Sequence, residues 1–338
     1  MKLNLYKILL TLGMIFISVN FALPQTQREQ GIEFYKQGKN KEAISVLLKA
    51  SKQKETKTDA EVWNYLGLAY LKDNDTKKAI KALEKAVNFN TQNAAYQTNL
   101  AYAYLLGNKI NKAQEESAKA IALNPQNADA YYIRGYASIL EDKNDEAIND
   151  ADKVISINPD YSLAYILKSD ALLSNFGKLF PTPANANDKL DLLNQSKSAL
   201  EMCLKNCRDN TNIKIQEERL EAVNAFYDFY NGRKDVDSDV PTVLAVSAPN
   251  ITPLTILSKK PASYTDNARA NQVSGTVRLL ILFAASGQVR HILILKGLGY
   301  GLTENAVRAA RQIKFEPAKQ DGKPISQVKI VEYNFILY

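Results

Sequence analysis

A spacing of 34 residues recurs through the first half of the sequence and restricts its fold more than any other feature. Three rows of small or apolar residues keep this period: Gly67, Ala101 and Gly135; Ala79, Ala113 and Ala147; Ala86, Ala120 and Val154. A repeat of this length indicates one supersecondary unit that is stacked several times. Small residues at fixed positions are expected where paired helices cross, because a larger side chain would hold the two backbones apart.

Each unit is predicted to contain two amphipathic helices, at residues 61–72 and 76–89 in the best-defined copy. Later units end at Asn-Pro pairs, since proline cannot continue a helix. The unit resembles the tetratricopeptide repeat (TPR) through these residues: Trp63, Leu66, Gly67, Tyr70, Ala79, Leu83, Ala86, Asn124 and Pro125. An earlier copy fits at residues 31–50, and a degenerate one begins near residue 162. In the degenerate copy we expect a first helix at 162–174, an insertion at 176–187, a second helix at roughly 188–207 and a last helix at 213–230. Residues 23–230 are therefore predicted to form an all-α TPR superhelix.

From residue 253 the apolar spacing changes from helical to alternating, which indicates strands. Runs at 274–284 and 289–296 predict an antiparallel hairpin, and a helix at 303–312 and a strand at 325–337 follow. The second face of the run at 274–284 carries Leu280 and Leu282. This face is therefore more apolar than a solvent-exposed face would be. The chain is thus predicted to be multidomain: the superhelix, a linker at 231–252, and at 253–338 a small α+β domain with a three-stranded antiparallel sheet.

Residues 253–338 resemble the C-terminal domain of TonB, the periplasmic energy transducer of Gram-negative bacteria. The match follows the family order through Tyr264, Ala268-Arg269, Gly275-Thr276-Val277, Gly287-Gln288-Val289, Gly299-Tyr300-Gly301-Leu302, Lys314-Phe315-Glu316-Pro317-Ala318, Asp321-Gly322-Lys323-Pro324 and Phe335. The family usually has a proline where Thr265 stands. It also has a membrane helix and a long Pro/Lys-rich spacer upstream, whereas a TPR array occupies that place here.

Residues 1–22 have the pattern of an export signal. Lys2 and Lys7 flank the start of an apolar run at 8–19, which ends near the small residue Ala22. The run is shorter than the roughly 20 residues that cross a bilayer comfortably, so we expect cleavage after Ala22. The alternative is an uncleaved anchor. Both versions export the chain, which predicts a location in the periplasm of a Gram-negative bacterium.

Side chains that usually perform chemistry are scarce. A single histidine, His291, excludes a His-rich metal site, and the cysteines Cys203 and Cys207 cannot complete a four-ligand zinc site. The cysteines, four apart on a predicted helix, are expected to be small buried residues, with a strained disulfide as the alternative. The glycines at 297–301 lack the Lys-Ser/Thr of a phosphate loop. We expect no enzyme, no cofactor and no metal.

The charge is concentrated at the C-terminal end. The whole chain carries +7, and residues 253–338, with 12 Lys and Arg against 5 Asp and Glu, also carry +7. Nucleic acid is a common partner of a basic domain, but export argues against it. Acidic protein segments or an anionic membrane surface fit better.

Two surfaces are candidates for binding proteins or peptides. A stacked array presents a concave surface made by the first helix of each unit, and the polar and aromatic candidates there are Asn64, Asn99, Tyr131 and Arg134. The alternative is that Tyr131 packs inside the stack and that the asparagines are merely solvated.

The second candidate surface is the last strand. By resemblance, TonB domains bind a short N-terminal box of outer-membrane receptors as an added strand beside it, a use of an exposed sheet edge. The candidate residues are Gln327, Lys329, Val331 and Tyr333. The alternative is that this strand completes the core or pairs with a second copy, which would give a homodimer.

Two functions follow. The first is an exported adaptor, in which the TPR array captures one protein and the TonB-like domain docks another at the cell envelope. The second is a divergent energy transducer in TonB-dependent transport, which would use ExbB and ExbD as partners only if the N-terminal segment is an anchor.

Overall fold

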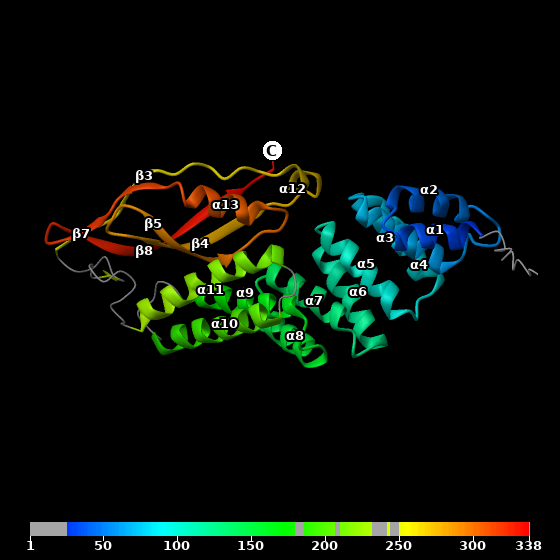
Figure 1. The fold of residues 1–338 in the computed structure, drawn as a ribbon, viewed down its shortest axis with the longest axis horizontal. Coiled ribbons are helices and arrows are strands. Elements are labelled where there is room, and N and C mark those ends of the chain that lie inside the picture. The colour runs from blue at the N-terminus through cyan, green and yellow to red at the C-terminus, as the bar shows by residue number, and fades with distance from the viewer. Residues whose placement is uncertain (1–25, 180–185, 207–209, 232–241, 244–249, 338) are drawn as a thin grey trace, which may run out of the picture.

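The computed structural model describes residues 26–179, 186–206, 210–231, 242–243 and 250–337. A helical array is followed by an α+β domain, as the sequence predicts (Figure 1). The predicted signal or anchor at 1–22 and most of the linker at 231–252 lie outside these residues.

The array consists of consecutive helices that pack as neighbours along the chain. They are α1 (Gln27–Lys36), α2 (Asn40–Ala50), α3 (Ala60–Lys72), α4 (Thr76–Phe89), α5 (Ala94–Leu106), α6 (Ile110–Leu123), α7 (Ala128–Leu140), α8 (Asn144–Ile157), α9 (Ser162–Lys178), α10 (Ala186–Asn206) and α11 (Asn210–Tyr230). The predicted helix at 76–89 has the observed bounds of α4, and the helix predicted at 61–72 begins one residue earlier, at Ala60.

The rows of small residues lie where the helices of a unit approach closely. A Cβ atom at Gly67 would lie 2.5 Å from Leu83 Cγ, and one at Gly135 would lie 3.0 Å from Asp150 Cβ of α8. Side chains there would force the helices apart, which explains the 34-residue spacing of the row. The turns between paired helices carry residues with positive φ at the same spacing: Asn74, Asn108 and Asp142.

The last helices of the array are longer than the sequence pattern predicts. The degenerate copy was expected to begin with a helix at 162–174, but α9 continues to Lys178. Its extra turn carries Phe176, which is fully buried, and Gly177, whose position faces Leu295 of the sheet. Tertiary packing therefore extends this helix into the predicted insertion at 176–187, of which residues 180–185 lie outside the described ranges.

The sheet contains the three antiparallel strands that the sequence predicts. In the order β5-β4-β8 they are β5 (Val289–Lys296), β4 (Gly275–Phe283) and β8 (Lys323–Phe335). Short strands extend it: β7 (Ala318–Gln320) pairs with the start of β8, β2 (Ile251–Thr252) pairs with β7, and β1 (Thr242–Val243) pairs with β8 in parallel. A separate pair is formed by β3 (Thr255–Ser258) and β6 (Lys314–Glu316).

One face of this sheet, here called the inner face, is covered by helices of its own domain. Val277, Leu279 and Ile281 of β4 are fully buried there, in one cluster with residues of α13 (Leu302–Ala310) and α12 (Asp266–Ala270). The helix predicted at 303–312 starts at Leu302, with Gly301 at its N-cap in a left-handed conformation (φ 79°).

The other face, here called the outer face, is covered by the array. Leu280 and Leu282 of β4 join Leu293 and Leu295 of β5 in a second buried cluster. The array side of this cluster comes from α9, α10 and α11, which lie along the opposite side of the sheet from α13 (Figure 1). The unexpected apolarity of Leu280 and Leu282 is therefore explained by contact with helices far away in the sequence.

Candidate protein-binding surfaces

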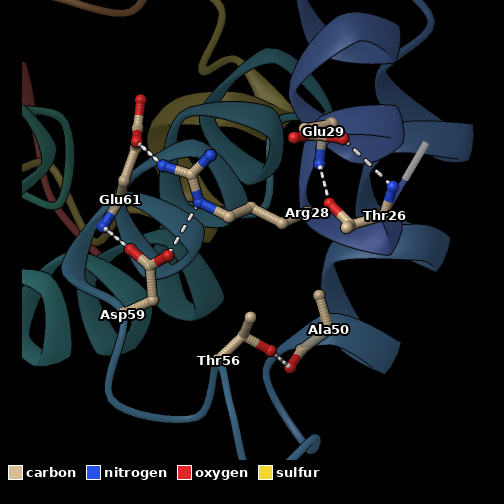
Figure 2. A network of polar contacts seen from close by, with 7 residues as sticks. All are labelled: Thr26, Arg28, Glu29, Ala50, Thr56, Asp59 and Glu61. Atoms are coloured by element: carbon tan, nitrogen blue, oxygen red, sulfur yellow. Dashed lines mark hydrogen bonds and ion pairs between the residues drawn. The ribbon is translucent and has the colours of Figure 1, made fainter. Parts of the chain in front are cut away.

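The N-terminal end of the inner surface of the array, formed by the first helices of the units, is held by a charged network. Arg28 of α1 reaches the start of α3, where its Nε lies 2.8 Å from Asp59 Oδ2 and its guanidinium also pairs with Glu61 (Figure 2). Asp59 is the N-cap of α3 and accepts the Glu61 backbone N–H at 2.9 Å. The network links the first unit to the second.

The two candidate asparagines contact each other. Asn99 Nδ2 of α5 donates to Asn64 Oδ1 of α3 at 2.8 Å, and Asn64 is buried. These side chains bridge neighbouring units, so the alternative that both are merely solvated does not describe Asn64. Their use in binding a partner stays a prediction.

The candidates of α7 are also partnered within the array. Arg134 forms a two-pronged contact with the buried carboxylate of Asp150 in α8, with N–O distances of 2.9 and 2.6 Å. Its guanidinium lies 5.3 Å from the centre of the Tyr131 ring. The bond to Asp150 raises the pKa of Arg134 further, so this residue ties the two helices of its unit together.

A cleft of about 410 Å³ lies between the array and the sheet domain. Tyrosines dominate its walls: Tyr102 of α5, Tyr132 and Tyr136 of α7, and Tyr300 of the loop after β5. The sequence prediction did not select these residues. Tyr102 and Tyr136 stand 34 residues apart, in the same position of successive units, and that spacing was the available signal.

Two polar contacts join the array to the sheet domain, one of them between residues that line the tyrosine cleft. The Tyr300 hydroxyl donates to the Leu106 carbonyl at the end of α5, and burial raises the pKa of Tyr300 to about 12. Lys296 Nζ lies 2.5 Å from Asp142 Oδ2, in the turn after α7. Tyr102, which also lines the cleft, is 44% exposed.

The side chains proposed for the strand-addition edge are mostly turned inward. Gln327, Val331 and Tyr333 are buried, the last two in the inner-face core, whereas Lys329 is exposed. Binding beside β8 would therefore depend on its backbone and on Lys329. Burial raises the pKa of Tyr333 to about 12, and Lys259 Nζ lies 4.7 Å from the centre of its ring.

On the edge of β8 that faces away from β4, the short strand β1 is already paired with Ser326 and Gln327. Gln327 pairs with Phe283 of β4 on one side and with Val243 of β1 in parallel register. Because a strand has two edges, β1 occupies the one that β4 leaves open. Further along, Lys259 Nζ donates to the Glu332 carbonyl at 2.7 Å.

The remaining candidate chemistry is limited. Cys203 is buried in α10, and Cys207 lies outside the described residues. Within the described ranges no group of three or more His, Cys, Asp and Glu side chains could hold a metal ion. None of the helices in the same ranges has the length and apolar character that crossing a bilayer requires.

Comparison with known families identifies both parts of the chain. Residues 28–97 and 98–162 match the tetratricopeptide repeat family, and residues 260–337 match the family described as Gram-negative bacterial TonB protein C-terminal. The chain therefore contains a TPR array and a TonB C-terminal domain, which together form a protein-interaction scaffold. The second family indicates a protein of the Gram-negative envelope.

Similar solved structures are TPR proteins. MamA is 28% identical with a TM-score of 0.45, over 52% of this chain and 95% of MamA. PilF of Pseudomonas aeruginosa is 14% identical with a TM-score of 0.48, over 63% of this chain and 86% of PilF. The first TPR of Spaghetti (RPAP3), bound to an HSP90 peptide, is 28% identical with a TM-score of 0.33, over 33% of this chain and 89% of that domain. The comparison with curated proteins finds no match.

Proposed function

We propose that this protein is an exported adaptor that holds two protein partners at a fixed spacing in the periplasm. The observation that carries the proposal is the apolar cluster between α9–α11 and the outer face of the sheet. Contact along a continuous buried surface keeps two domains in one arrangement, whereas domains joined only by a linker move independently. A partner on the array and a partner on the sheet would then be brought to a set distance.

The sheet partner binds as an added strand beside β8. The parallel pairing of β1 with Ser326 and Gln327 supports this, because the same edge already accepts an extended segment of the chain. Main-chain hydrogen bonds supply the affinity in this mode of recognition. The exposed ammonium of Lys329 and the basic charge of the domain favour an acidic peptide, such as the box of an outer-membrane receptor.

The array partner binds in the tyrosine cleft as an extended peptide. Tyrosine side chains provide large apolar contact areas at low cost in conformational entropy, and their hydroxyl groups add hydrogen bonds. Tyr102 lines the cleft and is partly exposed, so a bound peptide could contact its ring.

Export follows from the predicted signal at 1–22, and ExbB and ExbD would be partners only if that segment stays as an anchor. The adaptor function needs neither. Nucleic acid is not expected as a partner, because export removes the chain from it.

Strand addition is tested by NMR titration of the isotope-labelled chain, purified from the periplasm, with a receptor-box peptide. We expect chemical-shift changes concentrated in residues 326–335. The matched control is the same peptide with N-methylated amides, which keeps the side chains but cannot donate the main-chain hydrogen bonds. Absence of shifts in 326–335, or equal shifts with both peptides, would contradict strand addition.

The adaptor arrangement is tested in cells by photo-crosslinking amino acids placed at Tyr102 and at Lys329. We expect the two positions to capture different proteins, and both proteins to copurify with the unmodified chain. Crosslinks from position 329 to a second copy of this chain would instead support a homodimer through the C-terminal domain.

A further inference from the structure

One position of the repeat is aromatic in the second, fourth and fifth units but is a glutamine in the third. Residues at this position are Trp63, Gln97, Tyr131 and Tyr165, spaced by 34. The Trp63 indole donates to the Lys57 carbonyl at 2.8 Å, and Lys85 Nζ lies 3.9 Å from the centre of its ring. In the third unit, Gln97 therefore stands at the position of the Trp63 ring, which contacts the Lys85 ammonium in the second unit.

A cavity of about 710 Å³ lies at Gln97. Its walls come from α4, α5 and α6, and they include Glu84, Tyr104, Glu116 and Lys119. The second helices α4 and α6 thus line the cavity together with the first helix α5. The cavity is separate from the tyrosine cleft and from the edge of β8.

Two side-chain oxygens at this cavity are buried without a hydrogen-bond partner. They are Oε1 of Gln97, a residue 4% exposed, and Oε2 of Glu116, a residue 9% exposed. Their other polar atoms are used: Gln97 Nε2 donates to the Thr91 carbonyl at 3.2 Å, and Glu116 Oε1 accepts from Lys119 at 2.9 Å. A buried acceptor without a donor costs free energy, so a ligand that donates to either atom would offset that cost.

The charges of the cavity favour a cation. The cavity is lined by two carboxylates, Glu84 and Glu116, and by one ammonium, Lys119. The net charge of these three groups is −1. Lys119 stands 34 residues after Lys85, but it has no ring to cover and pairs with Glu115 and Glu116 instead. The Tyr104 hydroxyl is also occupied, since it donates to Glu84 at 2.7 Å.

We propose that this cavity binds the guanidinium of an arginine side chain from a partner protein. A guanidinium is planar and can insert between side chains, and its several N–H groups can donate to more than one acceptor. A bond to the Glu116 carboxylate is charge-assisted and stronger than a neutral one. A lysine ammonium lacks the planar shape, and an indole offers a single donor and no charge.

The full chain is titrated with N-acetyl-arginine methylamide and followed by NMR. The probe is taken to about 20 mM, because one small group held at a single site reaches millimolar dissociation constants. We expect shifts at residues 84–123 and at the side-chain amide of Gln97. The citrulline derivative, which keeps the shape without the charge, should bind roughly tenfold more weakly.

Three variants separate a specific site from general weakening. Glu116→Gln should reduce binding of the arginine probe at least about fivefold, since it removes the charge and keeps the shape. Gln97→Trp should abolish binding, because its ring takes up space in the cavity and the Gln97 side-chain acceptor is lost. Glu42→Gln is the matched control: it removes an exposed carboxylate of α2, outside the cavity, and should leave binding unchanged.

Several results would overturn the proposal. These are shifts that fall elsewhere or do not appear, equal binding of the citrulline or lysine derivative, tighter binding of the tryptophan derivative, and unaltered binding by Glu116→Gln. The last of these remains decisive if Gln97→Trp fails to fold.

Discussion

Both faces of the sheet are buried in apolar clusters, but they are covered by different parts of the chain. On the inner face Leu279 and Phe283 pack against residues of the same domain, and the Phe283 and Phe315 rings meet edge to face at 4.8 Å. On the outer face Leu280 packs against helices that end before residue 231. The inner face is a core that the domain builds alone, and the outer face is an interface that needs the array.

Because of this difference, the linker at 231–252 does not separate two independently packed domains. The sequence pattern divides the chain at residues 231–252, yet one of the two apolar clusters of the sheet crosses that division. An exposed apolar face of this size would favour aggregation, so the sheet domain is suited to folding against the array rather than alone. The two parts should consequently lose structure together.

The largest expected effect comes from Phe176→Ala in α9. Phe176 is fully buried at the outer face and meets Tyr230 edge to face at 5.6 Å. Removing such a ring lowers the free energy of unfolding by about 3–5 kcal/mol. We expect hydrogen exchange to accelerate in α9–α11 and in β4, β5 and β8 together, as measured by mass spectrometry.

The matched control is Leu83→Ala in the second unit, where Leu83 is equally buried but lies far from the sheet. Stability in repeat arrays depends on neighbouring units, so exchange should accelerate locally and leave β4 and β5 unchanged. If Phe176→Ala accelerates exchange in α9–α11 alone, the two domains are independent and the proposed fixed spacing fails.

The repeat units and the strands were predictable because their signals are local. Helix periodicity gave α4 with its observed bounds, and alternation gave β5. The extra turn of α9 was not predictable, because Phe176 and Gly177 meet a partner more than 100 residues away. The apolarity of Leu280 was visible in the sequence, but its partner was not.

For the candidate sites, too, local patterns were predictable from the sequence and long-range contacts were not. Asn64 and Asn99 were selected from their place on the first helices, but their bond to each other depends on how two units stack. Tyr102, Tyr136 and the substitution at Gln97 were all readable from the 34-residue period. What the period could not provide was the cleft with Tyr300, which exists only because the outer face docks on the array.

A smaller effect is expected from adding one methyl group at the outer face, with Gly177→Ala. The new Cβ would lie 3.0 Å from Leu295 Cβ of β5. Overpacking costs about 1–3 kcal/mol and exceeds the gain of about 1 kcal/mol in helix propensity. Chemical denaturation should show a net loss of stability. In the Leu295→Ala background the cost should fall, and an equal cost in both backgrounds would place the strain elsewhere.

The polar contacts beside the tyrosine cleft should matter less than the apolar interface. Tyr300→Phe removes the hydrogen bond to the Leu106 carbonyl, which is worth about 0.5–1.5 kcal/mol. The folded chain raises the pKa of Tyr300 from 10.0 to about 12, so it favours the neutral hydroxyl. This stabilisation is complete below pH 10.0 and is lost as the pH rises through about 12.

Denaturation midpoints at pH 9 and pH 11 test this assignment. Other tyrosines of the chain titrate in the same window, so the informative quantity is the difference between wild type and Tyr300→Phe. The variant should lose less stability between the two pH values than the wild type does. An equal loss would mean that Tyr300 ionises as freely in the folded chain as in the unfolded chain.

The smallest effect is expected for the ion pair between Lys296 and Asp142, which joins the end of β5 to the turn after α7. The two side chains are 28% and 49% exposed. Exposed pairs contribute about 0.2–1 kcal/mol, and salt screens them. A double-mutant cycle with Lys296→Gln and Asp142→Asn should give a coupling energy in that range that shrinks at high salt. A larger coupling, insensitive to salt, would mean that charge as well as apolar burial holds the sheet on the array.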